Sequence, residues 1–112
     1  AACDFYYQYN GAQNPAYFAI AASGERGLDW HYNANNHPMK GGDVVLLDYA
    51  PDFNYYVTDI TRTWPVNGKF TQAQREVYTV VRDAQAAAER QVRPGNAARA
   101  PSDSATAKRP AA

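Results

Sequence analysis

Apolar residues fall into short runs over the first two-thirds of the chain. Residues 17–22, 44–49 and 55–64 have the β-branched, aromatic or alternating composition of strands, and residues 28–32 predict a further brief strand that ends near His31. Residues 44–49 are apolar at successive positions, which is typical of a strand buried on both faces. The pattern therefore predicts an early part that is rich in strands.

Between these runs the sequence favours turns and loops. Residues 1–16 combine aromatic and polar side chains with Asn-Gly and Asn-Pro turn signals, residues 24–27 read as a turn, and residues 33–42 are rich in Asn, Gly and Pro.

The spacing changes to a helical period after residue 71. Thr71 and Gln74 fit a capping box, and neither Gly nor Pro interrupts residues 72–92. Apolar side chains recur there at helical spacing, and Pro94-Gly95 ends the pattern. We expect one long helix over residues 72–92.

The sequence after residue 95 consists mostly of Ala, Pro, Ser and Arg, a composition that predicts a disordered tail. All fifteen aromatic residues lie at or before Tyr78, so only the earlier part can build a core. We therefore divide the chain into a folded domain over residues 1–95 and a disordered tail over residues 96–112.

The net charge of zero hides an asymmetry that bears on partners. Residues 1–92 carry a net charge of −3 and the remainder +3. An acidic body lacks the basic face that nucleic-acid binding requires, and no apolar run reaches the roughly 18 residues of a membrane span. We expect no nucleic-acid or membrane partner.

A single cysteine, Cys3, excludes an internal disulfide and is compatible with a reducing compartment. No basic segment followed by an apolar one marks a signal peptide. We therefore expect a cytoplasmic protein, although the sequence begins at Ala1 rather than Met and its amino terminus need not be complete.

Two aspartates, Asp48 and Asp59, are placed so that a hairpin could bring them together. If strands 44–49 and 55–64 pair with Asp48 opposite Asp59, the turn falls within residues 52–55. Directly opposed residues carry their side chains on one face, with Cβ atoms about 4.5–5.5 Å apart. The sequence therefore predicts two adjacent carboxylates.

Such carboxylates repel, and the apolar run before Asp48 desolvates it. The pair needs a proton or a cation, and a hard divalent ion with oxygen ligands fits best. The alternative is that Asp48 only caps a strand and that Asp59 pairs with Arg62. Arg62 lies three residues after Asp59, however, and points to the opposite face of a regular strand.

His31 precedes Asp48 by seventeen residues. One interpretation is a proton shuttle or a substrate contact beside the ion, since histidine titrates near neutral pH. The other is a hydrogen-bonded loop histidine without a catalytic role. His37 lies in an Asn-Asn-His-Pro segment and is expected on an exposed loop.

Several segments together resemble one enzyme family. They are His31-Tyr32 with Asn35, GDVVLLD at 42–48, DITRTWPVNGKFT at 59–71, and Gln74, Arg75 and Tyr78. This combination resembles the pita-bread metallopeptidases, in particular the branch of aminopeptidase P and Xaa-Pro dipeptidase (prolidase). The resemblance covers about residues 17–95.

The resemblance implies an α+β fold, namely the first half of a pita-bread domain with antiparallel strands and one long helix. It also implies two divalent metal ions, Mn²⁺ in most relatives, held by two Asp, one His and two Glu. Asp48 and Asp59 match the two metal-binding aspartates, and His31 matches a catalytic histidine that contacts substrate and helps to move protons. A hydroxide generated between the metals would attack the carbonyl carbon of the peptide bond that precedes proline.

Three of the five ligands have no match in the sequence. No His follows His37, and the only Glu residues after Asp59 are Glu76 and Glu89, both in the predicted helix. We therefore interpret the chain as a fragment that is inactive alone. Half of a pita-bread sheet exposes an apolar surface and an unpaired edge, so we also expect the fragment to aggregate. The full-length parent would cleave peptides with proline in the second position and could be a homo-oligomer.

The alternative is a non-catalytic pita-bread module that binds peptides or proteins. Such modules typically lose the metal-binding aspartates, whereas this sequence retains both. Tyr49 departs from the family in another way, because relatives commonly carry Ala there. We expect its bulk to alter the substrate pocket.

Overall fold

The computed structural model describes residues 1–106; residues 107–112, the end of the predicted tail, lie outside this described part. The chain divides between Phe70 and Thr71 into two compact units. Each unit is described by itself. Among residues 1–106, no helix is both long enough and apolar enough to cross a bilayer.

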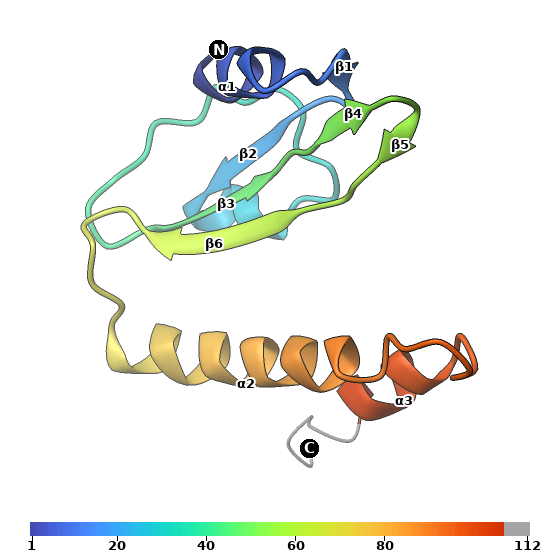
Figure 1. Ribbon diagram of the computed structural model, residues 1–112. Helices are drawn as coiled ribbons and strands as arrows, with labels where there is room; N and C mark the ends of the chain where they lie inside the picture. The colour runs from blue at the N-terminus through green and yellow to red at the C-terminus, as the bar shows by residue number, and fades with distance from the viewer. Residues whose placement is uncertain (107–112) are drawn as a thin grey trace. The chain divides into compact units, whose positions relative to one another are not determined.

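The first unit contains two small antiparallel sheets. One has the strand order β1-β4-β5, and the other has the order β2-β3-β6. Their strands are β1 (Asn14–Pro15), β2 (Ile20–Ser23), β3 (Val44–Asp48), β4 (Pro51–Phe53), β5 (Tyr56–Val57) and β6 (Thr61–Pro65). Figure 1 shows β3 in the middle of its sheet, with β2 on one side and β6 on the other.

The strand predicted over residues 44–49 is confirmed as β3. Its side chains alternate between the two faces of the sheet, and neighbouring residues Val45 and Leu46 are buried on one face and half-buried on the other. Val45 is only 2% exposed, and Ile20 and Ala22 of β2 are 7% and 2% exposed. These side chains and the fully buried Ala50 after β3 are the most buried apolar residues of the first unit, on both faces of the sheet.

The single strand predicted over residues 55–64 is wrong. The structure divides it into β5 and β6, with residues 58–60 outside any strand. Asn54 and Tyr55 form the tip of the hairpin between β4 and β5, with φ angles of 53° and 66°. A two-residue tip with both φ angles positive is the type I′ geometry, which matches the twist of the strands it joins.

The strand predicted over residues 28–32 is also wrong. A 3₁₀ helix, η1 (Gly24–Leu28), follows β2 directly, and Trp30 and His31 lie in a turn after it. His31 has a φ angle of 51°, which no strand residue adopts. The apolar residues of this segment are surface residues, since Leu28 is 86% and Trp30 91% exposed.

The structure adds a helix that the sequence analysis misses, α1 (Ala2–Tyr9). Aromatic contacts with the residue after β3 hold this helix. The ring of Tyr7 lies 5.7 Å from that of Tyr49, and the Tyr7 hydroxyl donates to the Tyr49 carbonyl at 3.1 Å. The Tyr49 hydroxyl in turn donates to Asp4.

These contacts direct the Tyr49 side chain toward α1. Successive side chains of an extended segment point to opposite faces, so Tyr49 leaves the face on which Asp48 lies. The expectation that Tyr49 alters the substrate pocket therefore finds no support in this arrangement.

The second unit contains α2 (Gln72–Glu89) and α3 (Ala100–Thr106). The predicted capping box is confirmed, because the Thr71 hydroxyl accepts from the Gln74 amide and the Gln74 side chain accepts from the Thr71 amide. The helix ends three residues earlier than expected, at Glu89. Helix α3 lies within the predicted tail, and the domain boundary at residue 95 stays a prediction.

Tyr49 provides a test of how α1 is held. The hydrogen bond to Asp4, and then partial burial, raise the pKa of Tyr49 to about 12. Because an unfolded tyrosine titrates near pH 10, the stability that Tyr49 contributes is complete below that pH and is lost as the pH rises toward 12. We expect Tyr49→Phe to lower the free energy of unfolding at neutral pH and to flatten its fall at high pH.

Urea unfolding at a series of pH values measures both effects. Tyr56→Phe is the matched control, because Tyr56 is 82% exposed on β5. Identical pH dependences for Tyr49→Phe and the unsubstituted chain would contradict the role given to this hydroxyl.

The capping box provides a second test. Thr71→Ala removes the acceptor for the Gln74 amide and should destabilise α2 by about 1 kcal/mol. Circular dichroism of a peptide covering residues 70–96 should show reduced helicity. Thr79→Ala, within the same helix, should instead preserve or raise it; equal losses in the two peptides would rule out a capping role.

Candidate metal centre

The hydroxyl of Tyr17, in the segment before β2, brings the two predicted aspartates together. It lies 2.5 Å from Oδ1 of Asp48 and 3.5 Å from Oδ1 of Asp59. It also accepts a hydrogen bond of 3.2 Å from the backbone amide of Ile60. One phenol therefore contacts both carboxylates and the chain between β5 and β6.

A hydroxyl has a single proton, so the shorter contact identifies Asp48 as the main acceptor. Partial burial, and then the hydrogen bond to Asp48, raise the pKa of Tyr17 to about 12. The phenol consequently stays protonated at neutral pH and remains a donor. Its donated proton offsets part of the repulsion between the two carboxylates.

The predicted pairing of Asp48 with Asp59 is wrong, because β3 and β6 pair with Asp48 opposite Thr61. A backbone hydrogen bond of 3.1 Å from Tyr49 to the Ile60 carbonyl continues the same register beyond the strands. The register differs from the expected one by two residues. Asp59 lies outside any strand, so its position is set by the chain between β5 and β6, where the Tyr17 hydroxyl contacts it as well as Asp48.

Asp48 and Asp59 occupy different backbone settings. Asp48 is the last residue of β3 and is half-buried, whereas Asp59 is exposed in the break between β5 and β6. Within the described part of the chain Arg62 has no ion pair with Asp59; its guanidinium donates to the Thr61 carbonyl at 2.8 Å. Asp59 is thus left available to a ligand.

His31 and Asp48 line one open hollow of about 280 Å³ on a face of the β2-β3-β6 sheet. Its floor consists of directly paired residues, which share a face: Ile20 and Ala22 of β2, Leu46 and Asp48 of β3, and Thr61 of β6. Residues 27–31 form its wall. The structure therefore brings His31 to the hollow that contains one of the two aspartates.

Aromatic rings surround the exposed imidazole of His31. The ring centre of Phe18 lies 6.5 Å away and that of Trp30 lies 5.9 Å away, both edge-on. Phe18 follows Tyr17 directly, so adjacent residues contact the two aspartates and His31. His37 lies in the loop before β3, as expected, but it is half-buried rather than exposed, and it does not line this hollow.

The donor chemistry fits part of a site for a hard divalent cation. Two carboxylates that share one hydroxyl are oxygen donors of the kind that Mn²⁺ and Mg²⁺ prefer. Within residues 1–106, however, no group of three or more His, Cys, Asp or Glu side chains is arranged to hold a metal ion. Asp48 and Asp59 can contribute to such a site but do not complete one.

The sequence and fold identify the family. Residues 1–107 match the model of metallopeptidase family M24, and the chain belongs to this family. It is 46% identical over 94 residues to the Xaa-Pro aminopeptidase of Escherichia coli and 45% identical over 84 residues to Xaa-Pro aminopeptidase 3 of Rattus norvegicus. These alignments cover 82% and 75% of this chain.

Solved structures confirm the predicted fold class. A Glu-to-Ala variant of Escherichia coli aminopeptidase P in complex with substrate matches 82% of this chain, with a TM-score of 0.77 and 46% identity. A His-to-Ala variant of the same enzyme matches 91%, with a TM-score of 0.83 and 41% identity. The α+β arrangement of helices and antiparallel strands is thus that of the pita-bread domain.

The match covers only a small part of each relative. The chain spans 21% of the curated E. coli enzyme, 17% of the rat enzyme and 21% of the first solved chain. The family match also continues past residue 95, where we expected the resemblance to stop.

Sequence reasoning misses Tyr17 as part of this site. Tyr17 begins the apolar run of residues 17–22, and a tyrosine there reads as a packing residue. Its contacts with Asp48 and Asp59 span 31 and 42 positions of sequence. No local pattern reports such a contact.

Tyr17→Phe tests whether this hydroxyl stabilises the site. The variant keeps the ring and removes the proton donated to Asp48 and the acceptor for the Ile60 amide. We expect the free energy of unfolding to fall by about 1 kcal/mol, measured by urea unfolding. Tyr9→Phe, at a position that is 79% exposed on α1, is the control; equal effects would remove the special role of Tyr17.

Proposed function

We propose that this chain supplies part of the active site of a metal-dependent aminopeptidase or dipeptidase that cleaves Xaa-Pro peptide bonds. In this proposal Asp48 and Asp59 are metal ligands, and His31 is a catalytic residue that contacts substrate. The observation that carries the proposal is the convergence of Asp48 and Asp59 on the Tyr17 hydroxyl.

The spacing of the three residues supports these roles. Three solved structures of Escherichia coli aminopeptidase P carry alanine at a histidine, at an aspartate 17 positions later and at a second aspartate 11 positions further on. His31, Asp48 and Asp59 have the same residue types at the same two intervals. This agreement makes Asp48 and Asp59 the best-supported ligands in the chain.

The same enzyme points to where further site residues would come from. It has been solved with alanine at histidines and a glutamate that follow the second aspartate by more than 70 positions, whereas 53 residues follow Asp59 in this sequence. We therefore infer that residues outside this sequence complete the proposed site.

Each residue of the site has a distinct proposed task. When two divalent ions, Mn²⁺ in our proposal, are bound, they supply a Lewis acid that polarises the scissile carbonyl and activates water. Asp48 and the exposed Asp59, both in contact with the Tyr17 hydroxyl, would hold these ions through their carboxylate oxygens. His31 borders the hollow, where it can hold substrate and pass a proton to the leaving proline nitrogen.

The incomplete donor set predicts an inactive chain. The 112-residue chain with Mn²⁺ should release no amino acid from Xaa-Pro dipeptides and tripeptides, because two carboxylates leave most positions of the ion to water. Chromatographic detection of the released amino-terminal residue measures the activity. Metal-dependent turnover by the chain alone would overturn the assignment of an incomplete site.

A graft into a complete enzyme tests the roles directly. Residues 17–70 would replace the matching segment of Escherichia coli Xaa-Pro aminopeptidase, and the graft should cleave Xaa-Pro peptides in the presence of Mn²⁺. Asp48→Asn or Asp59→Asn should lower kcat/KM more than about a hundredfold. Asp52→Asn is the matched control, because Asp52 lies on β4 and its Oδ1 accepts from the Tyr55 amide, a role that Asn preserves.

The same experiment separates the enzyme from a peptide-binding module. A module needs the hollow but not the metal ligands. Peptide affinity and activity that do not change in Asp48→Asn and Asp59→Asn would therefore favour the module over the enzyme.

A further inference from the structure

The loop between η1 and β3 holds His31 in an unusual backbone conformation. His31 and Asn35 both have a φ angle of 51°, in the left-handed region that costs most residues free energy. Two such residues within one short loop persist only where other contacts hold the backbone.

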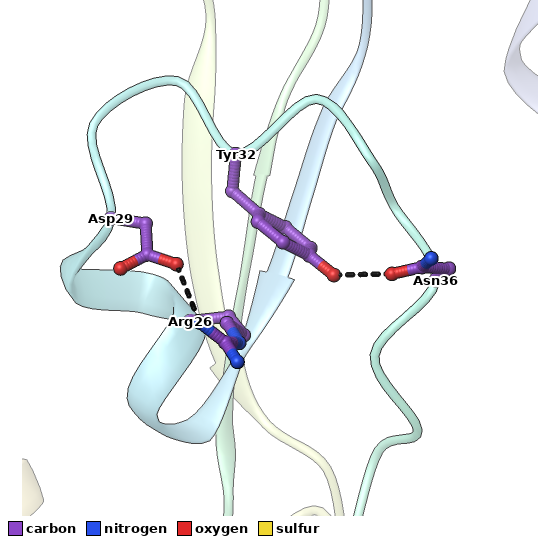
Figure 2. Close-up of polar contacts among 4 residues, drawn as sticks. All are labelled: Arg26, Asp29, Tyr32 and Asn36. Carbon is purple, nitrogen blue, oxygen red and sulfur yellow. Dashed lines mark hydrogen bonds and ion pairs between the residues drawn. The ribbon is translucent and has the colours of Figure 1, made fainter.

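One polar pair precedes His31 in the sequence and another follows it. The guanidinium of Arg26 lies 3.2 Å from a carboxylate oxygen of Asp29, and the Tyr32 hydroxyl donates to Asn36 at 2.6 Å (Figure 2). Arg26 and Asp29 are each about 45% exposed, so their ion pair contributes little. The Tyr32–Asn36 bond joins residues of the same loop and does not tie that loop to the sheet.

Asn35 supplies the tie to the sheet. Its Oδ1 accepts from the Ala21 amide at 2.6 Å, and its Nδ2 donates to the Ala19 carbonyl at 2.8 Å. Nδ2 also donates to the Asn33 carbonyl at 3.2 Å. One side-chain amide thus pairs with the outer edge of β2 as a neighbouring strand would, and it closes its own loop as well.

The edge that Asn35 occupies belongs to the segment that contacts the rest of the site. Tyr17 contacts both aspartates, Phe18 contacts the ring of His31, and Ala19 accepts from Asn35. Three consecutive residues therefore connect the carboxylates, the imidazole and the loop anchor. A loop released from this edge would lose the geometry that keeps His31 at the hollow.

We propose that Asn35 is a positioning residue for His31: its side-chain amide fixes the His31 loop to the edge of β2. This inference rests on the proposed function, in which His31 contacts substrate. Asparagine suits the position for two reasons. It tolerates the left-handed conformation better than most residues, and it offers a donor and an acceptor on one short side chain.

The test uses the full 112-residue chain and nuclear magnetic resonance. Asn35→Gly keeps the left-handed backbone at no steric cost and removes all three hydrogen bonds. The Ala21 amide should exchange with solvent about tenfold faster, and the nuclear Overhauser contact between the His31 and Phe18 rings should disappear. The Tyr49 amide, bonded to Ile60 at 3.1 Å, should keep its protection and so report that the sheet is intact.

Two further variants keep the test decisive. Asn35→Asp retains the acceptor for Ala21 and loses the donor to Ala19, so it should restore part of the Ala21 protection and part of the ring contact. Asn33→Ala changes a neighbouring asparagine whose side chain has no hydrogen bond in the described residues, and it should match the unsubstituted chain. If the Tyr49 amide also loses protection in Asn35→Gly, the sheet itself is disturbed, and the His31–Phe18 contact is then judged in Asn35→Asp instead.

An unchanged contact between His31 and Phe18 in Asn35→Gly, or in Asn35→Asp where that variant decides, would overturn the proposal. So would an equal loss in Asn33→Ala. Neither result depends on metal or turnover. Failure here would leave Asp48 and Asp59 as proposed ligands, whereas failure of the grafted enzyme would remove the proposed function and leave the loop contacts unaffected.

Discussion

The site depends on one phenol that holds two acidic side chains near each other. Without a partner, the carboxylates of Asp48 and Asp59 would repel and would favour separation or protonation. The Tyr17 hydroxyl contacts both and also accepts from the Ile60 amide. It therefore stabilises an arrangement that an isolated pair of strands would resist, and it does so without supplying a positive charge that would compete with a cation.

The backbone explains why these acidic side chains sit where they do. Asp48 ends β3, and Asp59 lies where the chain passes from β5 to β6. Regular strand structure is interrupted at residues 58–60, and the Asp59 side chain is exposed there. A rigid central strand beside a local break offers fixed position together with access for a ligand, which is what metal coordination requires.

The sequence predicts the central strand and the capped helix, because each rests on a local pattern. Val44–Asp48 is marked by continuous apolar residues, and Thr71 with Gln74 by the capping box. The sequence does not predict the exact register, because the turn at Asn54 and Tyr55 lacks the glycine that usually marks a type I′ hairpin. The two aspartates still lie near each other, because the Tyr17 hydroxyl contacts both.

Other features could not be read from local patterns. Tyr17 and Asn35 act through contacts with distant backbone and side chains, and α1 is held by the Tyr7–Tyr49 contact. His31 was expected at the end of a strand because Leu28 and Trp30 are apolar, yet both are exposed beside the hollow. Tertiary contacts decided these positions against their local propensity.

The central claim is that Asp48 and Asp59 form one cation-binding point around Tyr17. Titration of the ¹⁵N-labelled chain with Mn²⁺ tests it most directly, because a bound paramagnetic ion broadens nearby amide signals even when binding is weak. The account predicts that the signals of Ile60 and Tyr49 broaden first, ahead of those of the acidic residues on α2. Broadening that begins at Asp83 and Glu89, or is equal at all acidic positions, would contradict it.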